Sequence, residues 1–422
     1  MENEQRRVPL IRFEGFRDDW EQRKLKELFK TSKNKNNNGL YNQTDILAAS
    51  LGTELIPKKI FFGLKSTEES VKNYRIVKKG DLIYTKSPIK GFPNGIIRTN
   101  KGTIGIVPSL YCVYNLQKDI NPSIIQLYFE DKNRLDSYLF PLVNVGARNN
   151  VNITDLEFLE GNVILPKSSE EQSKIAQLIE QLNTTITLQQ RKLELLKKLK
   201  RGSLQQMFPQ NKESVPKVRF ADFDEEWEQH KFFDNIENII DFRGRTPKKL
   251  GMNWSKDGYL ALSALNVKNG FIDPKVDAHY GNKKLYDKWM RGHELRKGQV
   301  LFTTEAPMGN VAQVPDNKKY ILSQRTIAFT LKKDKITDDF LATLLRTPKS
   351  FNELTSLSSG GTAKGVSQRS LSQFKIMTPQ RLIEQRQIGA FFKHLDDTIT
   401  LRQQKLTLLK QLKKAFLQKM FI

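Results

Sequence analysis

Two copies of one long segment stand in this chain: EQSKIAQLIEQLNTTITLQQRKLELLKKLKRGSLQQMF at Glu171–Phe208 and, 213 positions later, EQRQIGAFFKHLDDTITLRQQKLTLLKQLKKAFLQKMF at Glu384–Phe421. Of the 38 aligned positions, 20 are identical. A shorter segment also recurs, because VPLIRFEGFRDDWEQRK at Val8–Lys24 matches VPKVRFADFDEEWEQHK at Val215–Lys231. The stretches between the copies hardly resemble each other. The chain therefore consists of two halves that share a frame and differ in their inserts.

The long repeat has the hydrophobic spacing of a coiled-coil helix, close to 3.5 residues, with Gln189 as a polar exception. A helix of about 35 residues is about 50 Å long. The expected seam residues are Ile175, Ile179, Leu182, Ile186, Leu193 and Leu196 in the first copy and Ile388, Phe392, Leu395, Ile399, Leu406 and Leu409 in the second. Met207, Phe416 and Met420 continue the stripe.

Two arrangements of these helices are open. Each helix could pack only on its own half, or the two helices could pair with each other. Pairing is favoured because the stripes are too long for one small domain to cover and match position for position. An antiparallel pair would hold two domains at a fixed spacing, longer than one turn of B-DNA at about 34–36 Å. Pro166 and Pro379 stand just ahead, where a helix can begin.

The inserts, from Leu25 to Pro166 and from Phe232 to Pro379, show a mixture of helix and strand patterns. The predicted fold class is α+β, with two mixed α/β domains, two long helices in an antiparallel coiled coil and a pseudo-twofold internal repeat. The predicted boundaries are 1–166, 167–210, 211–379 and 380–422, for domain, helix, domain and helix. Strands are expected at 81–85, 95–98, 104–108, 111–114, 259–262, 299–303, 310–314 and 325–331, and helices at 123–138 and 337–346. The recurring aromatic residues of the short repeat are expected in the core or at a docking surface: Phe13, Phe16, Trp20, Phe220, Phe223 and Trp227.

Composition indicates a polyanionic partner. Lys and Arg total 70 against 46 for Asp and Glu, a formal charge of +24, and phosphate neutralisation releases counterions. A basic ribosome-associated protein would share this feature. Cys112 is the single cysteine, which predicts a reducing compartment. With no apolar segment typical of a signal peptide or a membrane span, a cytoplasmic location is expected.

The loops of the inserts combine basic and amide side chains with glycine. Arg and Lys can reach guanine edges, Asn and Gln can pair with adenine, and backbone amides at glycines can meet phosphates. Any one of these residues could instead contact phosphate or solvent. The candidate DNA-binding residues are Lys86, Ser87, Lys90, Arg148, Asn149, Asn150, Arg243, Arg245, Thr246, Lys248, Thr304, Lys364, Ser367, Gln368 and Arg369.

Motifs for catalysis are missing from the sequence. GGTAKGVS has the glycine spacing of a phosphate loop from Gly360 to Gly365, but Val366 stands where the lysine is needed. The four histidines and one cysteine offer no metal-ligand spacing, and no Asn-Pro-Pro-aromatic motif for amino-methylation occurs. The sequence therefore predicts a chain that is not an enzyme.

The duplicated arrangement of insert and long helix, each half led by the Trp-Glu-Gln segment, resembles the specificity (S) subunit of type I restriction–modification systems along the whole chain. FRGRTPKK at Phe242–Lys249 resembles the family's frequent GGTP element, and YLALSALNVKNG at Tyr259–Gly270 continues the pattern. The first insert lacks a GGTP element. The resemblance implies a DNA reader whose inserts each take one half of a bipartite target, separated by a gap that the helices set.

The resemblance also implies partners and cofactors. Double-stranded DNA, two methyltransferase subunits and ATP-driven restriction subunits would assemble with this chain. S-adenosylmethionine, ATP and Mg would be bound in the partner subunits, and none by this chain. The alternative is a basic RNA-binding or ribosome-associated scaffold, which would show no preference for duplex DNA over structured RNA.

Overall fold

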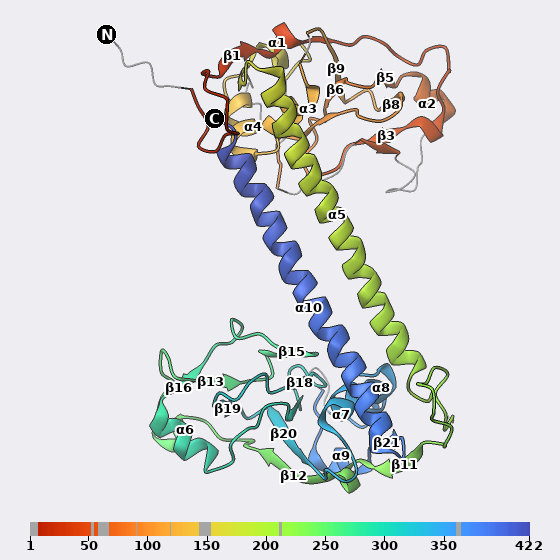
Figure 1. Ribbon diagram of the computed structural model, residues 1–422, viewed down its shortest axis with the longest axis vertical. Coiled ribbons are helices and arrows are strands. Elements are labelled where there is room, and N and C mark those ends of the chain that lie inside the picture. The colour runs from red at the N-terminus through yellow and green to blue at the C-terminus, as the bar shows by residue number, and fades with distance from the viewer. Residues whose placement is uncertain are drawn as a thin grey trace. The chain divides into compact units, whose positions relative to one another are not determined.

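The computed structural model describes residues 7–51, 55–57, 67–89, 91–118, 120–142, 153–210, 213–359 and 364–422. It divides into two compact units (Figure 1). Unit 1 comprises Met1–Gln190 with Lys405–Ile422, and unit 2 comprises Arg191–Gln404. Each long helix therefore contributes one part to each unit.

Unit 1 is built on an antiparallel four-stranded sheet with strand order β2-β9-β6-β7. Two-stranded sheets β1-β10, β3-β4 and β5-β8 surround it. Its elements, with η for 3-10 helices, are β1 (Glu21–Lys24), α1 (Leu25–Leu28), β2 (Phe29–Thr31), η1 (Gln43–Asp45), β3 (Leu47–Ala48), β4 (Ile56–Pro57), α2 (Glu68–Lys72), β5 (Arg75–Val77), β6 (Leu82–Tyr84), β7 (Ile97–Thr99), β8 (Gly105–Val107), β9 (Cys112–Leu116), α3 (Pro122–Tyr128), α4 (Lys132–Leu139), η3 (Glu157–Glu160) and β10 (Asn162–Leu165).

Unit 2 repeats the same sheet, with antiparallel strand order β12-β20-β17-β18, and adds the sheets β16-β13-β19, β11-β21 and β14-β15. Its elements are β11 (Glu228–Lys231), η4 (Phe232–Asn235), β12 (Ile236–Asp241), η5 (Lys248–Leu250), β13 (Tyr259–Leu262), β14 (Val267–Lys268), β15 (Phe271–Ile272), β16 (Tyr280–Gly281), α6 (Lys283–Met290), β17 (Val300–Thr303), β18 (Val311–Gln313), β19 (Ile321–Leu322), β20 (Thr326–Leu331), α7 (Asp338–Leu345), α8 (Pro348–Ser356), α9 (Gln368–Gln373) and β21 (Lys375–Thr378).

The predicted strands all occur, with bounds that differ by a few residues. The helical region expected at 123–138 occurs, divided into two helices, α3 and then α4. Asp131 is the reason: its carboxylate accepts hydrogen bonds from the backbone N–H groups of Asn133 and Arg134 at 2.9 and 3.2 Å, which caps a new helix.

The long repeats form the helices α5 (Ser169–Gln206) and α10 (Leu382–Lys419), of 38 residues each. Both begin three residues after a proline, as expected. Within unit 2, Lys200 pairs with Asp396, and the ring of Phe208 lies 6.1 Å from that of Phe392. From the first contact to the second, residue numbers rise along the first long segment and fall along α10. The helices therefore run antiparallel, and the predicted fold class is confirmed. None of the α-helices in the described ranges is long and apolar enough to cross a membrane.

None of the twelve expected seam residues is exposed. Leu182, Leu196, Ile399 and Leu409 are half-buried. The other eight are buried: Ile175, Ile179, Ile186, Leu193, Ile388, Phe392, Leu395 and Leu406. At their ends the helices also join the domain cores, since Ile175 and Leu417 belong to the core of unit 1, and Leu204 and Phe392 to a core of unit 2. The helices thus pack both on the domains and on each other.

The same buried clamp fixes the short repeat to the first turn of each long helix. In unit 1 the guanidinium of Arg12 donates to both carboxylate oxygens of Glu171, at 2.7 and 2.9 Å, and the indole of Trp20 donates to Glu171 at 3.4 Å. The hydrogen bond to Glu171 raises the pKa of Arg12 above its ordinary value. Both the Glu171 side chain, at 1% exposure, and Trp20, at 2%, are buried.

Unit 2 contains the clamp again. Arg219 donates to Glu384 at 2.7 and 2.8 Å, and the indole of Trp227 donates to the same carboxylate at 3.3 Å. Glu384 is also 1% exposed. The aromatic residues Trp20 and Trp227 are therefore core residues, as predicted, and Phe13 and Phe220 pack partly buried against the same cores.

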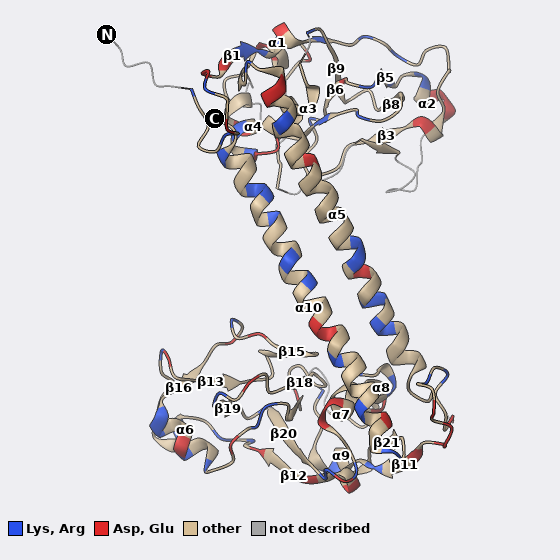
Figure 2. Cartoon of the chain, in the orientation of Figure 1, with Lys and Arg blue, Asp and Glu red and all other residues tan. Residues whose placement is uncertain are grey.

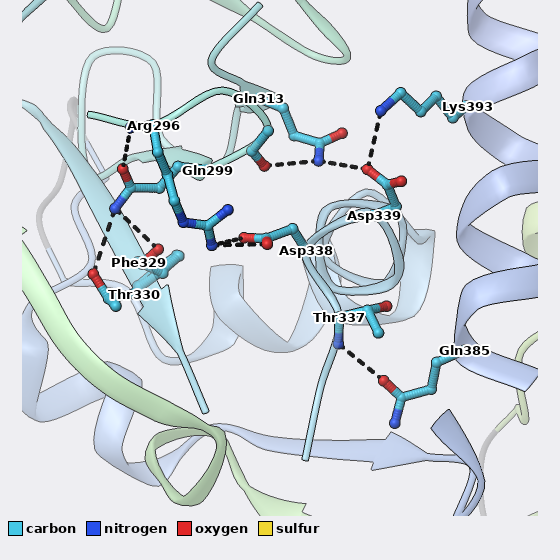
Figure 3. A network of polar contacts seen from close by, with 11 residues as sticks. Arg296, Gln299, Gln313, Phe329, Thr330, Thr337, Asp338, Asp339, Gln385 and Lys393 are labelled. Carbon is cyan, nitrogen blue, oxygen red and sulfur yellow. Dashed lines mark hydrogen bonds and ion pairs between the residues drawn. The ribbon is translucent and has the colours of Figure 1, made fainter. Parts of the chain in front are cut away.

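The glutamine that follows each clamp glutamate joins its helix to the domain. Gln385 donates to the carbonyl of Pro379. It also accepts from the backbone N–H of Thr337, just before α7 (Figure 3). Gln172 makes the equivalent bonds with Pro166 and Asn121. Each long helix is thus connected to a strand end and to the start of a domain helix.

Further ion pairs hold α7 in place in unit 2, as Figure 3 shows. Asp338 accepts two hydrogen bonds of 2.8 Å from Arg296, and Asp339 accepts from Gln313 at 2.8 Å and pairs with Lys393 of α10. These contacts join the sheet, α7 and α10 into one body within this unit.

The end of α10 completes unit 1 in the way that the end of α5 completes unit 2. The backbone N–H of Ile11 donates to the carbonyl of Lys419, and that of Val218 donates to the carbonyl of Gln206. Edge-to-face ring contacts accompany both bonds, Trp20 with Phe421 at 6.1 Å and Trp227 with Phe208 at 5.8 Å. The internal repeat is therefore a structural repeat down to single hydrogen bonds.

Replacing Arg219 by Ala is predicted to destabilise unit 2 by about 3–5 kcal/mol, because the Glu384 carboxylate stays buried without its partner. Hydrogen exchange of the β11 and β21 amides in the full chain measures the change in opening free energy. Lys283→Ala is the matched control. Its ion pair with Asp287 has side-chain exposures of 78% and 54%, so little or no change in the opening free energy is expected. If Arg219→Ala lowered the opening free energy as little as the control does, the clamp would not stabilise unit 2 in this way.

Candidate nucleic-acid interface

A hollow of about 440 Å³ opens on the surface of unit 2. Its lining comes from the segment after β12, the loops that flank β13 and β16, and the turn between β19 and β20. Three predicted residues, Arg245, Thr246 and Lys248, line it together. The segment that resembles the GGTP element therefore forms part of a concave surface.

Arg245 is held by the protein itself. Its guanidinium lies 4.2 Å from the centre of the Phe242 ring and donates to the backbone carbonyl of Trp289. Burial, together with the nearby Arg291, lowers the pKa of Arg245 from its ordinary value. The side chain thus fixes the segment after β12 against α6 and leaves few donors for a ligand.

A flat stacked pair forms another part of the lining. The ring of His279 lies 5.5 Å from that of Trp254, with an angle of 11° between the planes. His279 Nε2 is 3.2 Å from Asp277 Oδ1, and the other oxygen of Asp277 accepts from Ser263 at 2.6 Å. The pair is therefore fixed in orientation by a hydrogen-bonded carboxylate.

Two further residues of the lining, Gln324 and Arg325, stand in the turn before β20. The Gln324 side chain makes no hydrogen bond within the described part of the chain, and Arg325 is half-exposed. Neither is identified from the sequence as a DNA-binding residue, because Arg325 begins an expected strand, 325–331, and the turn Ser-Gln-Arg lacks glycine.

The remaining predicted residues of unit 2 lie outside the hollow. Arg243 pairs with Asp241 at 3.1 Å, and Gln368 donates to the same carboxylate at 3.1 Å, so these two come together. Ser367 caps α9 by accepting from the backbone N–H of Ser370. Thr304 is buried, whereas Lys364 and Arg369 are exposed.

Unit 1 has a hollow of about 590 Å³ beside β2. Lys33, Lys35 and Arg75 line it, together with Thr154 and Asp155. Lys33 and Lys35 follow β2 as Arg243 and Arg245 follow β12, and these strands hold the same place in the two sheets. This equivalence, which the shared sheet order reveals, identifies the two lysines as further candidate residues.

The structure describes two of the predicted residues of the first insert, Lys86 and Ser87, and neither lines this hollow. Lys86 is 3.5 Å from Asp155, which also pairs with Arg75. Ser87 lies beside Lys86 on the segment after β6 and does not line the hollow. Lys90, Arg148, Asn149 and Asn150 lie outside the described residues.

The thiol of Cys112 donates a hydrogen bond to Asp155, which lines the hollow of unit 1. Burial, with the Asp155 carboxylate that accepts its hydrogen bond, raises the pKa of Cys112 to about 11, so the thiol is protonated at neutral pH. Within the described ranges, no three His, Cys, Asp or Glu side chains come together to hold a metal ion. The arrangement offers hydrogen-bond donors and positive charge on concave surfaces, which suits recognition of nucleic acid.

The family model described as "Type I restriction modification DNA specificity domain" matches the chain twice, at residues 17–198 and 225–411. This chain belongs to that family. It is a specificity subunit of the type I restriction–modification kind, and the two matches coincide with the duplicated halves.

One curated relative and two solved structures are similar to this chain over nearly its whole length. The chain is 23% identical over 432 residues to a putative type I restriction enzyme specificity subunit of Methanocaldococcus jannaschii, covering 95% of this chain and 92% of the relative. Among solved structures, the type I restriction–modification S subunit of M. genitalium shares the fold, with a TM-score of 0.60 and 12% identity over 98% of this chain and 99% of that one. The HsdS subunit of Thermoanaerobacter tengcongensis matches with a TM-score of 0.45 and 16% identity, covering 95% of this chain and 96% of that one.

Proposed function

We propose that this specificity subunit reads a bipartite DNA target, with one half-site taken by the domain of unit 1 and the other by that of unit 2. The observation that carries the proposal is the contrast between frame and loops. The clamps at Glu171 and Glu384 repeat contact for contact, whereas the linings of the two hollows differ. Among the described residues, Asn253, His279 and Gln324 line the hollow of unit 2, and no Asn, His or Gln lines that of unit 1. Two unlike readers on one repeated frame suit an asymmetric target.

The chain acts in this proposal without chemistry of its own. It holds the duplex while a methyltransferase subunit takes the target adenine out of the stack, since methyl transfer to a base needs that access. S-adenosylmethionine belongs to that partner, and ATP and Mg to the restriction subunits.

Exchanging residues 25–161 for the corresponding segment of another specificity subunit is predicted to change one half-site and to leave the other half-site and the gap intact. The exchange points preserve the β1-β10 pair and the Glu171 clamp, so the frame should keep its fold. Mapping the methylated motif measures the outcome, and the reciprocal exchange of residues 232–374 serves as control. A change in both half-sites at once would refute the two-reader proposal.

The gap between the half-sites is proposed to follow the length of the helix pair. A helix of 38 residues is about 57 Å long at 1.5 Å per residue. The seam spacing of seven residues, as from Ile186 to Leu193 and from Ile399 to Leu406, permits whole heptads to be added without changing which residues face the partner helix.

Duplicating residues 188–194 in α5 and 401–407 in α10 together is predicted to lengthen the gap by up to about three base pairs, since seven residues add about 10.5 Å and base pairs are spaced by about 3.4 Å. The methylated motif of the variant reports the gap directly. A heptad in one helix only is the control, because it should break the pairing. An active double variant with an unchanged gap would exclude the helices as the determinant.

Docking of two methyltransferase subunits is supported by a matching stripe on each long helix. The leucines Leu188, Leu195 and Leu199 are 52%, 58% and 50% exposed, and their spacings of seven and four residues place them on one face of α5. Exposed large apolar side chains in a row are typical of interaction sites.

The equivalent leucines of α10 are Leu401, Leu408 and Leu412, which are 65%, 64% and 40% exposed. Lys192 and Lys405 stand at matching positions within the two stripes, and Figure 2 shows other Lys and Arg along both helices. Two identical stripes suit two copies of one partner, presenting an amphipathic helix with acidic flanks.

Leu195→Glu is predicted to reduce the bound methyltransferase from two copies to one, because a buried charge would replace an apolar contact. Leu195→Glu with Leu408→Glu should bind none. Native mass spectrometry of the reconstituted complex gives the stoichiometry. Arg201→Glu, an exposed position two residues beyond Leu199 and so on the far side of the helix, should keep both copies. If the double variant still bound two copies of the methyltransferase, the stripes would not be its docking sites.

A further inference from the structure

Arg325 occupies a special place in the hollow of unit 2. Its side chain is 51% exposed, and its Nε lies 3.0 Å from Glu305 Oε1. Glu305 thus engages the inner nitrogen of the guanidinium. The two terminal nitrogens make no hydrogen bond within the described part of the chain, and the residue lines the hollow. An arginine held in this way presents its terminal fork to a ligand.

The backbone of Arg325 is fixed as well. Its carbonyl accepts from the backbone N–H of Thr304 at 2.9 Å and from the Thr304 hydroxyl at 3.3 Å. Thr304 in turn accepts from the backbone N–H of Val366 at 2.9 Å, and Glu305 pairs with Gly365 in an isolated β-bridge. Three chain segments therefore hold the arginine and its glutamate in one orientation, which preorganises the fork for binding.

Other cations of this surface lack that combination. The Arg245 guanidinium is occupied by the Phe242 ring and the Trp289 carbonyl. Arg243 is paired with Asp241 outside the hollow. Lys248 lines the hollow but offers a point charge and no planar fork. Arg325 is thus the cation best suited to a planar partner with two neighbouring acceptors.

We propose that Arg325 reads one guanine of the half-site taken by unit 2, donating from its two terminal nitrogens to O6 and N7 in the major groove. Glu305 and Thr304 are positioning residues for this contact. The inference rests on the proposed function and names a specificity-determining residue for it. The predicted role of Thr304 in direct DNA contact is replaced by one through Arg325.

The test uses the full chain assembled with its methyltransferase and duplexes in which every position of the half-site is substituted in turn. Arg325→Ala should weaken binding to the intact half-site by about 5- to 150-fold and abolish discrimination at one guanine only. Arg325→Lys should keep binding to a duplex without the target sequence but lose discrimination at that guanine. Lys283→Ala, which removes an exposed cation of the same domain, should leave both properties unchanged.

Glu305 is tested by its effect at the same position. Glu305→Ala should reduce discrimination at the guanine that Arg325 reads and at no other, whereas Glu305→Gln, which keeps an acceptor for Nε, should restore part of it. A general loss of folding would lower binding to all duplexes equally, which distinguishes it from a loss of discrimination at the one guanine.

Two results would overturn the inference. Equal weakening of all duplexes by Arg325→Ala would make the residue a phosphate contact, and unchanged discrimination would place it outside the interface. Both require that the unaltered complex discriminates at the half-site. If the unaltered complex does not discriminate, the proposed function itself fails. Failure of the proposed function is therefore distinguishable from failure of the role given to Arg325.

Discussion

A buried carboxylate at the start of each long helix is the contact on which the rest of this structure depends. Glu171 and Glu384 are each 1% exposed, and a carboxylate removed from water is costly unless charged and hydrogen-bonded partners surround it. A bidentate arginine and an indole N–H meet this need in both units. The consequence is geometric, because the short repeat, the helix and the strand pair beside it are fixed as one body.

The repeated frame leaves the loops free to differ. The end of α10 serves unit 1 through Lys419 and Phe421, and the end of α5 serves unit 2 through Gln206 and Phe208. Glu130 directly precedes the N-cap residue of α4 and Arg346 that of α8, yet the two side chains carry opposite charges. Glu130 pairs directly with Lys413; burial acts to raise the pKa of Glu130, but Lys413 and Arg98 outweigh it, so the pKa is lowered. Arg346 instead pairs with Asp396. The frame thus tolerates substitutions that preserve its pairing, which suits a chain whose readers change.

Sequence reasoning succeeded where one periodic signal was repeated. The seam from Ile175 to Leu196 and the buried Trp20 follow from spacing and duplication alone, since the two copies report on each other. It did not find the roles of individual loop residues. Arg245 is held by the Trp289 carbonyl and Thr304 bonds to Arg325; these partners are distant in sequence, so no local pattern reveals them. Lys33 and Lys35 became recognisable only through the shared sheet order.

The central claim, that two unlike readers share one frame, is tested most directly by mapping N6-methyladenine across the genome of a host with and without this gene, with the methyltransferase partner expressed. The account predicts one gene-dependent motif made of two different short halves around a gap of constant length. A gene-dependent motif that is continuous, or no motif although the partner is shown to be bound, would contradict it. In the second case, stronger binding of structured RNA than of duplex DNA would support a scaffold role.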